Sequence, residues 1–307
     1  MRYVVVGLGN IGQRRRALLG ERCVATADPF NEAAEYRSVR DVPTDAYDAA
    51  VLAIPDDDKI ALVTYLLEHG KHVLVEKPLP LPDEETARRL ELLARERGLA
   101  LYTAYNHRFE PMLSALWEQV ESGTIGEIYH GRLFYGNGTV KHVAGTWRDQ
   151  GLGVISDLGC HLLDLLAFVG KGGGQGGREM RLVAAQSIES KAPDRALIVS
   201  ADGRFTLEVM YHAWRNSFAF ELYGEKGSLH CFGLRKWGGS ELIVRKRVFP
   251  SGRPEETRET DEGPDVTWER ELEELERRCT SGTTDLATDW WIARTLRGLE
   301  AELGVVG

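Results

Sequence analysis

The 307-residue sequence contains few cysteines, and their spacing excludes two classes of protein. No two of them form a CxxC pair, and they lie far apart in the sequence, at Cys23, Cys160, Cys231 and Cys279. This pattern does not fit a fold built on disulfides or on a cysteine zinc site. We therefore expect reduced thiols and no metal centre.

Long apolar runs are also missing. No stretch approaches the roughly 20 residues that are needed to cross a membrane. The N-terminal Met1-Arg2 leads directly into an apolar strand and not into the charged-then-apolar pattern of a signal peptide. The sequence therefore predicts a cytoplasmic protein with no membrane association.

Basic residues do not dominate the charge. The chain has 38 Lys and Arg against 47 Asp and Glu, a formal net charge of -9, and no basic patch of the kind that nucleic acid requires. We therefore expect no nucleic-acid partner. The length of 307 residues exceeds one typical domain and favours two.

The most informative stretch lies at the N-terminus. An apolar run over residues 3–6 is followed by the motif GLGNIG, which comprises Gly7, Leu8, Gly9, Asn10, Ile11 and Gly12. Good helix formers come next, so the motif lies between a strand and a helix, as in a dinucleotide-binding fold. Its first glycine permits a tight turn, its second lets backbone approach a pyrophosphate, and its third allows close packing. The helix N-terminus offers free N–H groups to the phosphates.

An acidic residue stands at the expected distance from this motif. A second strand over residues 24–27 ends at Asp28, which fits an acid that bonds the ribose hydroxyls. The alternative is a solvated turn acid. No arginine follows within residues 29–32, so a 2′-phosphate would meet an anion, and NAD is favoured over NADP. The arginines at 14–16 form either a solvated helix face or a contact to that phosphate.

Strands then alternate with helices up to residue 107. We expect strands at 47–54, 72–75 and 99–103, with helices between them at 56–70 and 83–97. This alternation predicts a doubly wound parallel sheet in a dinucleotide-binding domain over 1–107. Ligands bind at the carboxyl ends of such strands, where Pro55, Glu76, Lys77 and Asn106 lie.

The pattern changes in the second domain, 108–307. Consecutive strands with few helices predict a mostly antiparallel sheet and an α+β domain. We expect irregular structure at 137–150, a glycine-rich loop at 170–177 and a polar loop at 251–264. The predicted strands are 128–135, 180–190, 195–200, 205–212, 217–223, 228–232 and 242–249, and the predicted helices are 111–121, 157–169, 266–279 and 285–302.

Two places carry side chains suited to chemistry. Asp157 and His161 lie four residues apart, and Asp164 follows three further on, so on a helix the imidazole has a carboxylate on either side. The alternative is a helix cap and a core histidine. Lys77 follows a buried strand and precedes a proline, which restricts its backbone to an extended form. The alternative there is an exposed turn lysine.

Several motifs together resemble one family. GLGNIG, the segment GKHVLVEKPL around Lys77, and DLGCHLLD around His161 occur in order, with YNHRFEP at 105–111, Trp147-Arg148 and a late GEKGSL turn. This combination resembles the glucose-fructose oxidoreductase / inositol dehydrogenase / MocA family over nearly the whole chain. The resemblance implies an NAD(P)-dependent dehydrogenase that acts on CH–OH groups of sugars, polyols or sugar derivatives.

The resemblance also implies a catalytic trio, which maps onto Lys77, Asp157 and His161. In this assignment His161 exchanges the hydroxyl proton, Asp157 orients it, and Lys77 stabilises the developing alkoxide. Further candidates for the substrate pocket are Asn106, Arg108, Trp147 and Arg148, for which packing and salt bridging at a domain interface is the alternative.

The sequence departs from the family pattern at two positions. Neither belongs to the catalytic trio, so the departures affect the expected substrate more than the expected catalysis. Leu152 replaces a glycine before the second helix, and Lys59 replaces a histidine that often follows the proline at position 55. An alternative function is a catalytically silent regulator that binds NAD and a sugar, although retention of the trio argues against it. The family also implies a homodimer or homotetramer formed through the C-terminal sheet; a partner-binding subunit has only the apolar strands in its favour.

Overall fold

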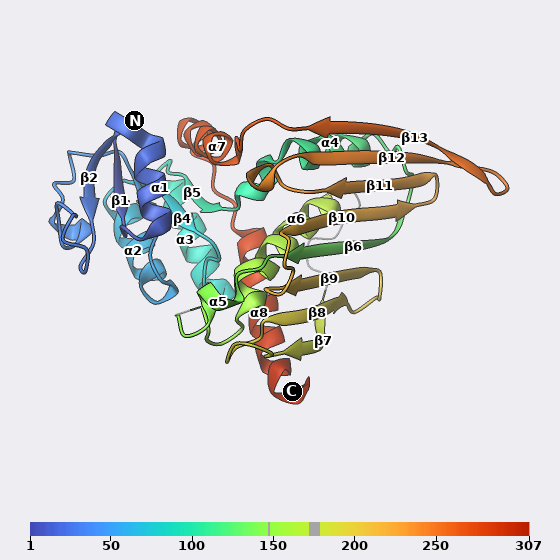
Figure 1. Ribbon diagram of the computed structural model, residues 1–307. Coiled ribbons are helices and arrows are strands. Elements are labelled where there is room, and N and C mark those ends of the chain that lie inside the picture. Colours follow the sequence, from blue (N-terminus) through green and yellow to red (C-terminus); the bar gives the residue numbers. More distant parts are fainter. Residues whose placement is uncertain (147, 172–178, 307) are drawn as a thin grey trace. The chain divides into compact units, whose positions relative to one another are not determined.

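The computed structural model describes residues 1–146, 148–171 and 179–306. The chain forms two compact units (Figure 1). The first comprises Met1–Asn106 and Trp268–Ala293, and the second comprises His107–Thr267 and Arg294–Gly307. The sequence analysis expected a single domain boundary at residue 107. In the structure the segment Trp268–Ala293 returns to the first unit.

The first unit is built on a five-stranded parallel sheet with the order β2-β1-β3-β4-β5. Its strands are β1 (Tyr3–Val6), β2 (Cys23–Ala27), β3 (Ala49–Leu52), β4 (His72–Glu76) and β5 (Leu101–Ala104). Its helices are α1 (Asn10–Leu19), α2 (Asp56–Glu68), α3 (Glu84–Glu96), α7 (Thr267–Ser281) and the start of α8 (Ala287–Val306). The predicted doubly wound parallel sheet is confirmed.

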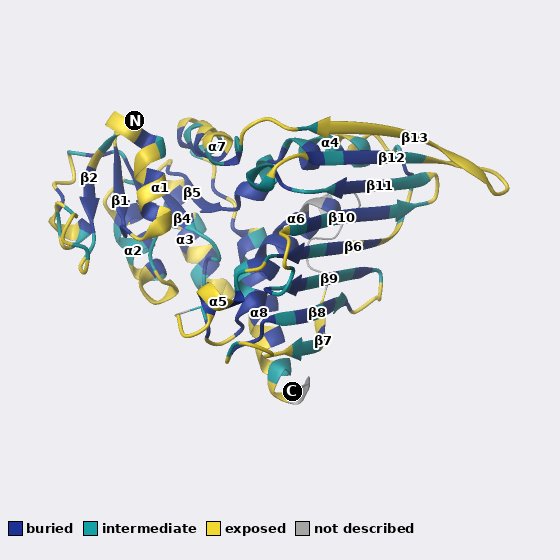
Figure 2. Cartoon of the chain, viewed as in Figure 1, coloured by how far each residue is buried: buried dark blue, intermediate teal, exposed yellow. Residues whose placement is uncertain are grey.

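Alternating residues of β1 show that both faces of this sheet are covered. Val4 and Val6 belong to an apolar cluster that also contains residues of α2 and α3. Tyr3 points to the other face, where its hydroxyl donates to Glu276 of α7 at 2.7 Å. All four residues of β1 are therefore buried, as in other parallel sheets with helices on both sides (Figure 2).

One of the three arginines of α1 does not behave as the sequence suggested. Arg15 is only 2% exposed, and its guanidinium forms ion pairs with Glu76 at 2.7 Å and with Glu271 of α7 at 2.6 Å. Arg14 and Arg15 also lie over the ring of Trp268, each at 4.1 Å from its centre. The expectation of a solvated face, or of a contact to a 2′-phosphate, is wrong for Arg15, because its charge is used to dock α7.

The second unit is built on an eight-stranded sheet with the order β13-β12-β11-β10-β6-β9-β8-β7. It is mostly antiparallel, as predicted, with one parallel pair, β6 and β9. The strands are β6 (Ile128–Gly136), β7 (Met180–Gln186), β8 (Arg195–Ser200), β9 (Phe205–Met210), β10 (Ser217–Gly224), β11 (Gly227–Phe232), β12 (Ser240–Val248) and β13 (Gly252–Asp261). The helices are α4 (Pro111–Glu121), α5 (Val140–Val143), α6 (Cys160–Lys171) and the end of α8.

Strand β13 corrects one expectation, because 251–264 was predicted to be a loop. The strand has no buried face (Figure 2), and it pairs with β12 through its main chain and through cross-strand ion pairs. Arg245 pairs with Glu256 at 2.8 Å, and Arg258 with Glu241 at 2.7 Å. Most of the predicted loop 170–177 lies outside the described residues.

The two faces of the large sheet differ. One face is apolar and carries α4 and α6: the ring of Trp117 on α4 meets Phe220 at 5.3 Å between centres, and His161 on α6 lies 6.0 Å from Tyr135. Among the strand residues of this face that are at most 2% exposed are Leu133, Tyr135, Leu207, Val209, Phe220 and Leu222. The other face mixes half-buried apolar residues with a polar network of Arg132, Glu221, His230 and Arg245.

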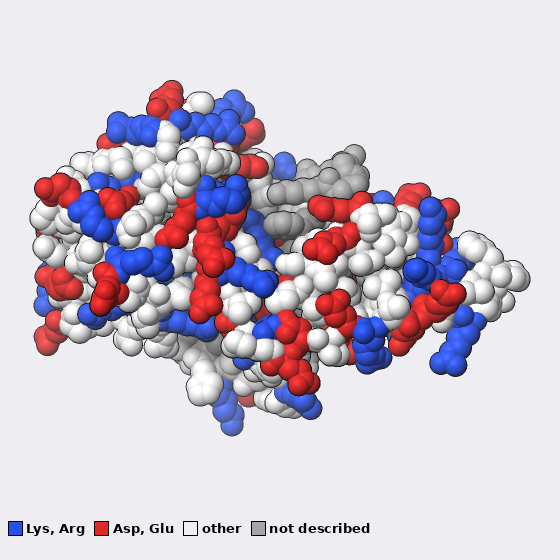
Figure 3. Space-filling model, turned by 90° about the horizontal axis from the view of Figure 1, so that it is seen from above, with Lys and Arg blue, Asp and Glu red and all other residues white. Residues whose placement is uncertain are grey.

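Charged side chains of both signs are interspersed on the face seen in Figure 3. Among the described residues, no helix is long and apolar enough to cross a membrane.

Candidate functional site

The glycine motif forms the turn between β1 and α1. Gly7 has a φ of +86°, and a Cβ there would collide with the carbonyl of Ala53. A Cβ on Gly12 would collide with the carbonyl of Gly7, so both positions require glycine for the fold itself. A Cβ on Gly9 would meet nothing within 4 Å, so this glycine borders open space.

The start of α1 is suited to an anion. Gly9 is its N-cap, no side chain caps the helix, and its first turn contains no acidic residue. The free N–H groups and the partial positive charge of a helix start favour phosphate. The open space at Gly9 and this uncapped start therefore fit the pyrophosphate of a dinucleotide.

Asp28 closes the other side of this turn. Its carboxylate accepts hydrogen bonds from the backbone N–H of Leu8 at 2.7 Å, Phe30 at 2.8 Å and Asn31 at 2.9 Å. Burial alone would raise the pKa of Asp28, but these backbone N–H groups hold its pKa below the usual value. The carboxylate stays ionised and keeps acceptor capacity for further donors, such as hydroxyl groups.

Lys77 follows the carboxyl end of β4. The preceding Glu76 is the acid that pairs with Arg15. The carbonyl oxygens of Lys77 and Pro78 accept hydrogen bonds from the ammonium of Lys59 on α2. Pro55 is the N-cap of α2, and Asp56, Asp57 and Asp58 lie in the first turn of this helix.

In the second unit, Asp157 lies in a π-helical turn, Ile155–Gly159, which leads directly into α6. Its carboxylate accepts a hydrogen bond from the hydroxyl of Tyr211 at 3.0 Å, and Arg148 lies 3.7 Å away. Burial and the carboxylate of Asp157 raise the pKa of Tyr211. The tyrosine hydroxyl therefore stays protonated and fixes the orientation of Asp157.

His161 lies in the first turn of α6 and is 7% exposed. Its ring stacks on His107, with 4.2 Å between centres and 17° between planes. His107 in turn lies 3.3 Å from the hydroxyl of Tyr135, which accepts a hydrogen bond from Lys236 at 2.6 Å. The imidazole of His161 is therefore held by an aromatic stack that is itself anchored to β6.

Asp164, expected beside the imidazole of His161, is bonded to Arg108. Its carboxylate is 1% exposed and accepts two hydrogen bonds from the Nε of Arg108, at 2.9 and 3.1 Å, and a third from the Nη2 of the same side chain. This buried pair ties the segment after β5 to α6.

Comparison with known proteins gives the chain a family. Residues 1–105 match the family model described as "Oxidoreductase family, NAD-binding Rossmann fold", and residues 113–230 match "GFO/IDH/MocA C-terminal domain". The chain belongs to the Gfo/Idh/MocA oxidoreductase family. The family predicted from the sequence motifs is confirmed, and the first unit is its NAD-binding domain.

Individual relatives of the Gfo/Idh/MocA family match parts or all of the chain. An inositol 2-dehydrogenase of Rhizobium meliloti is 30% identical over 142 residues, which cover 42% of this chain and 43% of that protein. The matched segments span only 31% to 43% of the first curated relatives.

Solved structures show the shared fold over the full length. A levoglucosan dehydrogenase in complex with NADH has a TM-score of 0.78 at 18% identity, covering 100% of this chain and 98% of that one. A UDP-N-acetylglucosamine 3-dehydrogenase of Acidithiobacillus ferrooxidans has a TM-score of 0.76 at 20% identity, covering 99% of both chains.

The structure divides the predicted site residues between the units. The first unit contains Gly7, Gly9, Asn10, Ile11, Gly12, Asp28, Pro55, Glu76, Lys77 and Asn106. The second contains Arg108, Arg148, Asp157 and His161, of which Arg148 and Asp157 lie together. Trp147 lies outside the described residues.

Three residues around the predicted histidine were not identified from the sequence. They are Tyr211, Tyr135 and Lys236, which come from strands and loops far from His161 in the chain. His107 was noted only as part of YNHRFEP, and its position three residues beyond the fifth strand was the one signal that could have marked it.

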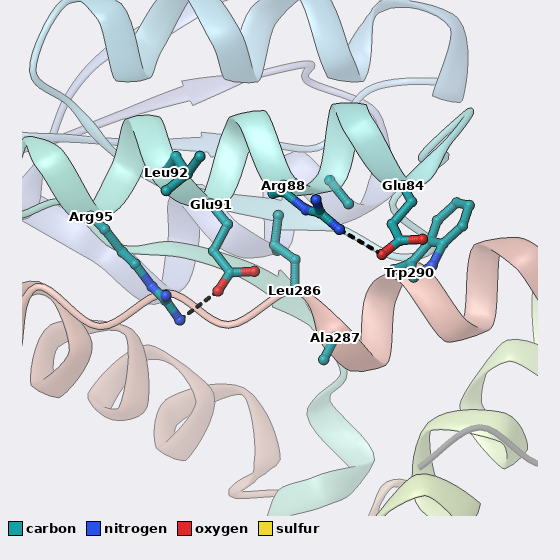
Figure 4. Close-up of a pocket in the computed structure, with 9 residues that line it drawn as sticks. Glu84, Arg88, Glu91, Leu92, Arg95, Leu286, Ala287 and Trp290 are labelled. Atoms are coloured by element: carbon teal, nitrogen blue, oxygen red, sulfur yellow. Dashed lines mark hydrogen bonds and ion pairs between the residues drawn. The ribbon is translucent and has the colours of Figure 1, made fainter.

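A pocket of about 320 Å³ lies in the first unit between α3 and the start of α8 (Figure 4). Its charges are paired with one another: Arg88 with Glu84 at 3.0 Å, and Arg95 with Glu91 at 2.5 Å. None of the predicted site residues lines it. Among the described residues, no group of three side chains is arranged to hold a metal ion.

Glu110, at the end of YNHRFEP, gives a prediction for pH dependence. It is 2% exposed, and burial raises its pKa to about 7, although its carboxylate accepts a hydrogen bond from the backbone N–H of Arg235 at 3.2 Å. Because the folded-state pKa exceeds the unfolded value, the contribution to stability is complete below about pH 4.5 and is lost as the pH rises through about 7.

We expect Glu110→Gln to remove this loss, which is on the order of 3 kcal/mol. Urea unfolding at about pH 5 and about pH 8 measures it: the wild type should lose more stability than the variant over this interval. Glu118→Gln, at an exposed position on α4, the helix that follows Glu110, is the control and should behave like the wild type. Equal pH dependence in wild type and Glu110→Gln would contradict the assignment.

Proposed function

We propose that the protein is an NAD-dependent dehydrogenase that transfers hydride between nicotinamide and a hydroxyl or carbonyl of a sugar, polyol or sugar derivative. The NAD-binding family match and the open, uncapped glycine turn at Gly9 support the cofactor. The relatives named inositol 2-dehydrogenase and D-glucoside 3-dehydrogenase support the substrate class.

In this proposal His161 acts as the acid or base. When bound, NAD would supply the hydride acceptor, and His161 takes the proton of the substrate hydroxyl, or returns it in the reductive direction. Asp157 orients this exchange and holds the substrate hydroxyl. The observation that carries the assignment is the fixed carboxylate of Asp157, bonded to Tyr211 at 3.0 Å, one helical turn before a stacked, nearly buried His161.

Lys77 supplies the positive charge in this scheme. An ammonium next to the reacting oxygen stabilises the alkoxide that develops as hydride leaves. The backbone of Lys77 is fixed at the carboxyl end of β4, the edge at which ligands bind in such sheets.

The proposed roles predict the effect of two substitutions. We expect His161→Ala and Lys77→Ala to lower kcat by roughly 10²–10⁴-fold, the size of lost proton-transfer assistance. Binding of NADH, followed by its fluorescence, should be unchanged, because neither side chain forms the glycine turn. Production of NADH with a panel of inositols, aldoses and nucleotide sugars measures kcat.

His69→Ala, an exposed histidine at the end of α2, serves as the control and should retain full activity. Normal turnover in both test variants would show that the roles are wrong. Tight NAD binding by the wild type without turnover of any substrate would favour the catalytically silent regulator.

The preference for NAD over NADP is proposed on the charge of Asp28. Its ionised carboxylate would repel a 2′-phosphate. Arg37 contributes to its lowered pKa and donates to the carbonyl of Pro29 at 3.3 Å.

We expect Asp28→Ser combined with Phe30→Arg to shift the ratio of kcat/KM for NADP over NAD upward by at least about tenfold, since each 1.4 kcal/mol is a factor of ten. Phe30 is 92% exposed, so an arginine is tolerated there. Phe30→Arg alone is the control and should shift the ratio less. An unchanged ratio in the double variant would mean that the ribose is recognised elsewhere.

A homo-oligomer through the large sheet is also proposed. The face of the sheet opposite α4 and α6 carries apolar side chains that are only half-buried, namely Phe134, Leu197, Val199, Ala219 and Phe232. Apolar residues lying side by side on neighbouring strands indicate a face that packs against another surface. A second copy of the chain fits the mixed apolar and ion-paired character of this face.

We expect the wild type to be a dimer or tetramer and the double variant Leu197→Glu/Val199→Glu to be a monomer, since each charge would be buried without a partner. Light scattering after gel filtration measures the mass. Leu92→Glu, at a 50% exposed position on α3, is the control and should keep the wild-type mass. A monomeric wild type would reject this surface as a self-association site.

A further inference from the structure

Lys59 is a buried lysine whose contacts converge on the segment that contains Lys77. Its side chain is 2% exposed. Its Nζ donates to the carbonyl oxygen of Lys77 at 3.3 Å and of Pro78 at 2.9 Å, and it pairs with Asp56 at 2.7 Å. An ammonium has three N–H donors, so these three acceptors satisfy it completely.

Such a buried charge is costly to keep. Burial lowers the pKa of Lys59, and the carboxylates of Asp56 and Glu76 oppose this effect. A methionine of similar length would avoid the desolvation of an ammonium, and replacing buried ions by apolar residues is often neutral or stabilising. The main role of the ammonium is therefore to hold the two carbonyl groups to which it donates.

The same segment is tied from the other side. The carboxylate of Glu76 accepts a hydrogen bond from the Nε of Arg15 at 2.8 Å, and Arg15 is itself paired with Glu271. The residue before Lys77 is thus fixed through its side chain, while Lys77 and Pro78 are fixed through their carbonyl groups. Groups locked in this way before a ligand arrives cost no reorganisation during a reaction.

We propose that Lys59 is a positioning residue for Lys77: its ammonium clamps the carbonyl groups of Lys77 and Pro78, so that the Lys77 side chain starts from a fixed backbone. The inference rests on the proposed function, in which Lys77 stabilises the alkoxide. It also explains why a cation can occupy the position where the family often has histidine. Both residues can donate to a carbonyl oxygen, but the ammonium reaches two at once.

The chain offers a matched control at the opposite end of β4. Lys71 is a partly buried lysine that also donates to a backbone carbonyl, that of Tyr47, at 2.9 Å. It precedes β4, whereas Lys77 follows it. Lys71→Met therefore removes the same kind of hydrogen bond from the same unit without touching the Lys77 segment.

The test compares Lys59→Met with Lys71→Met in the full-length protein. We expect Lys59→Met to lower kcat by about 10²-fold, the effect of a displaced catalytic group, with the Kd for NADH unchanged. The high-pH limb of the kcat–pH profile should also move, because the substitution removes the positive charge of Lys59, which interacts with that of Lys77. Lys71→Met should leave kcat and its pH profile as in the wild type.

Hydrogen exchange provides a readout that needs no substrate. The amides of Lys77, Leu79 and Leu81 should exchange at least about tenfold faster in Lys59→Met than in Lys71→Met, because the clamp no longer opposes local opening. If Lys59→Met does not fold, Lys59→Gln, which keeps N–H donors without the charge, takes its place and should lose kcat less than Lys77→Ala does.

The outcomes separate the two proposals. Faster exchange with undiminished kcat, or equal losses of kcat in Lys59→Met and Lys71→Met, would overturn the positioning role. Exchange as slow as in the wild type would overturn the clamp itself. Full activity of Lys77→Ala would instead reject the role of Lys77 in the proposed function, and the exchange result would still report whether Lys59 holds the segment.

Discussion

The ion pairs of Arg15 are the interaction on which the first unit depends. A guanidinium removed from water requires counter-charges, and Glu76 and Glu271 supply them from β4 and α7. These contacts join the helix that starts at the glycine turn, the strand that ends before Lys77, and a helix from the far end of the sequence. The return of α7 to the first unit therefore belongs to the same charge network that fixes the predicted ligand-binding edge.

Local patterns were sufficient for the elements of this edge. The glycine spacing predicted the turn. A Cβ at Gly7 or Gly12 would collide with backbone, so both positions require glycine, and this requirement is visible in the sequence. The burial of Arg15 could not be predicted in the same way. Its partner Glu271 is remote in the sequence, and three consecutive arginines look like a solvated helix face until the chain that covers them is known.

The second unit shows the same division between local and long-range information. The spacing of Asp157 and His161 placed both near the start of one helix, although a π-helical turn replaces the first part of the predicted helix. The groups that orient them, Tyr211 and His107, come from other elements and follow from the strand pairing, which spacing does not reveal. Strand β13 was missed because the alternation of apolar residues that marks other strands is absent where both faces meet solvent.

The distribution of buried polar groups bears on whether the protein is an enzyme or a binding protein. A regulator that only held NAD would need the glycine turn and Asp28, the proposed contacts to the dinucleotide. The buried ammonium of Lys59, by contrast, holds the carbonyl groups of Lys77 and Pro78, the backbone from which the Lys77 side chain starts. Burying a charge costs desolvation free energy. The buried charges of Lys59 and Arg15 both hold the segment of Lys77, which indicates that the placement of the Lys77 side chain matters. A fixed side-chain origin is a requirement of catalysis, in which small displacements of a charged group are costly, more than of binding.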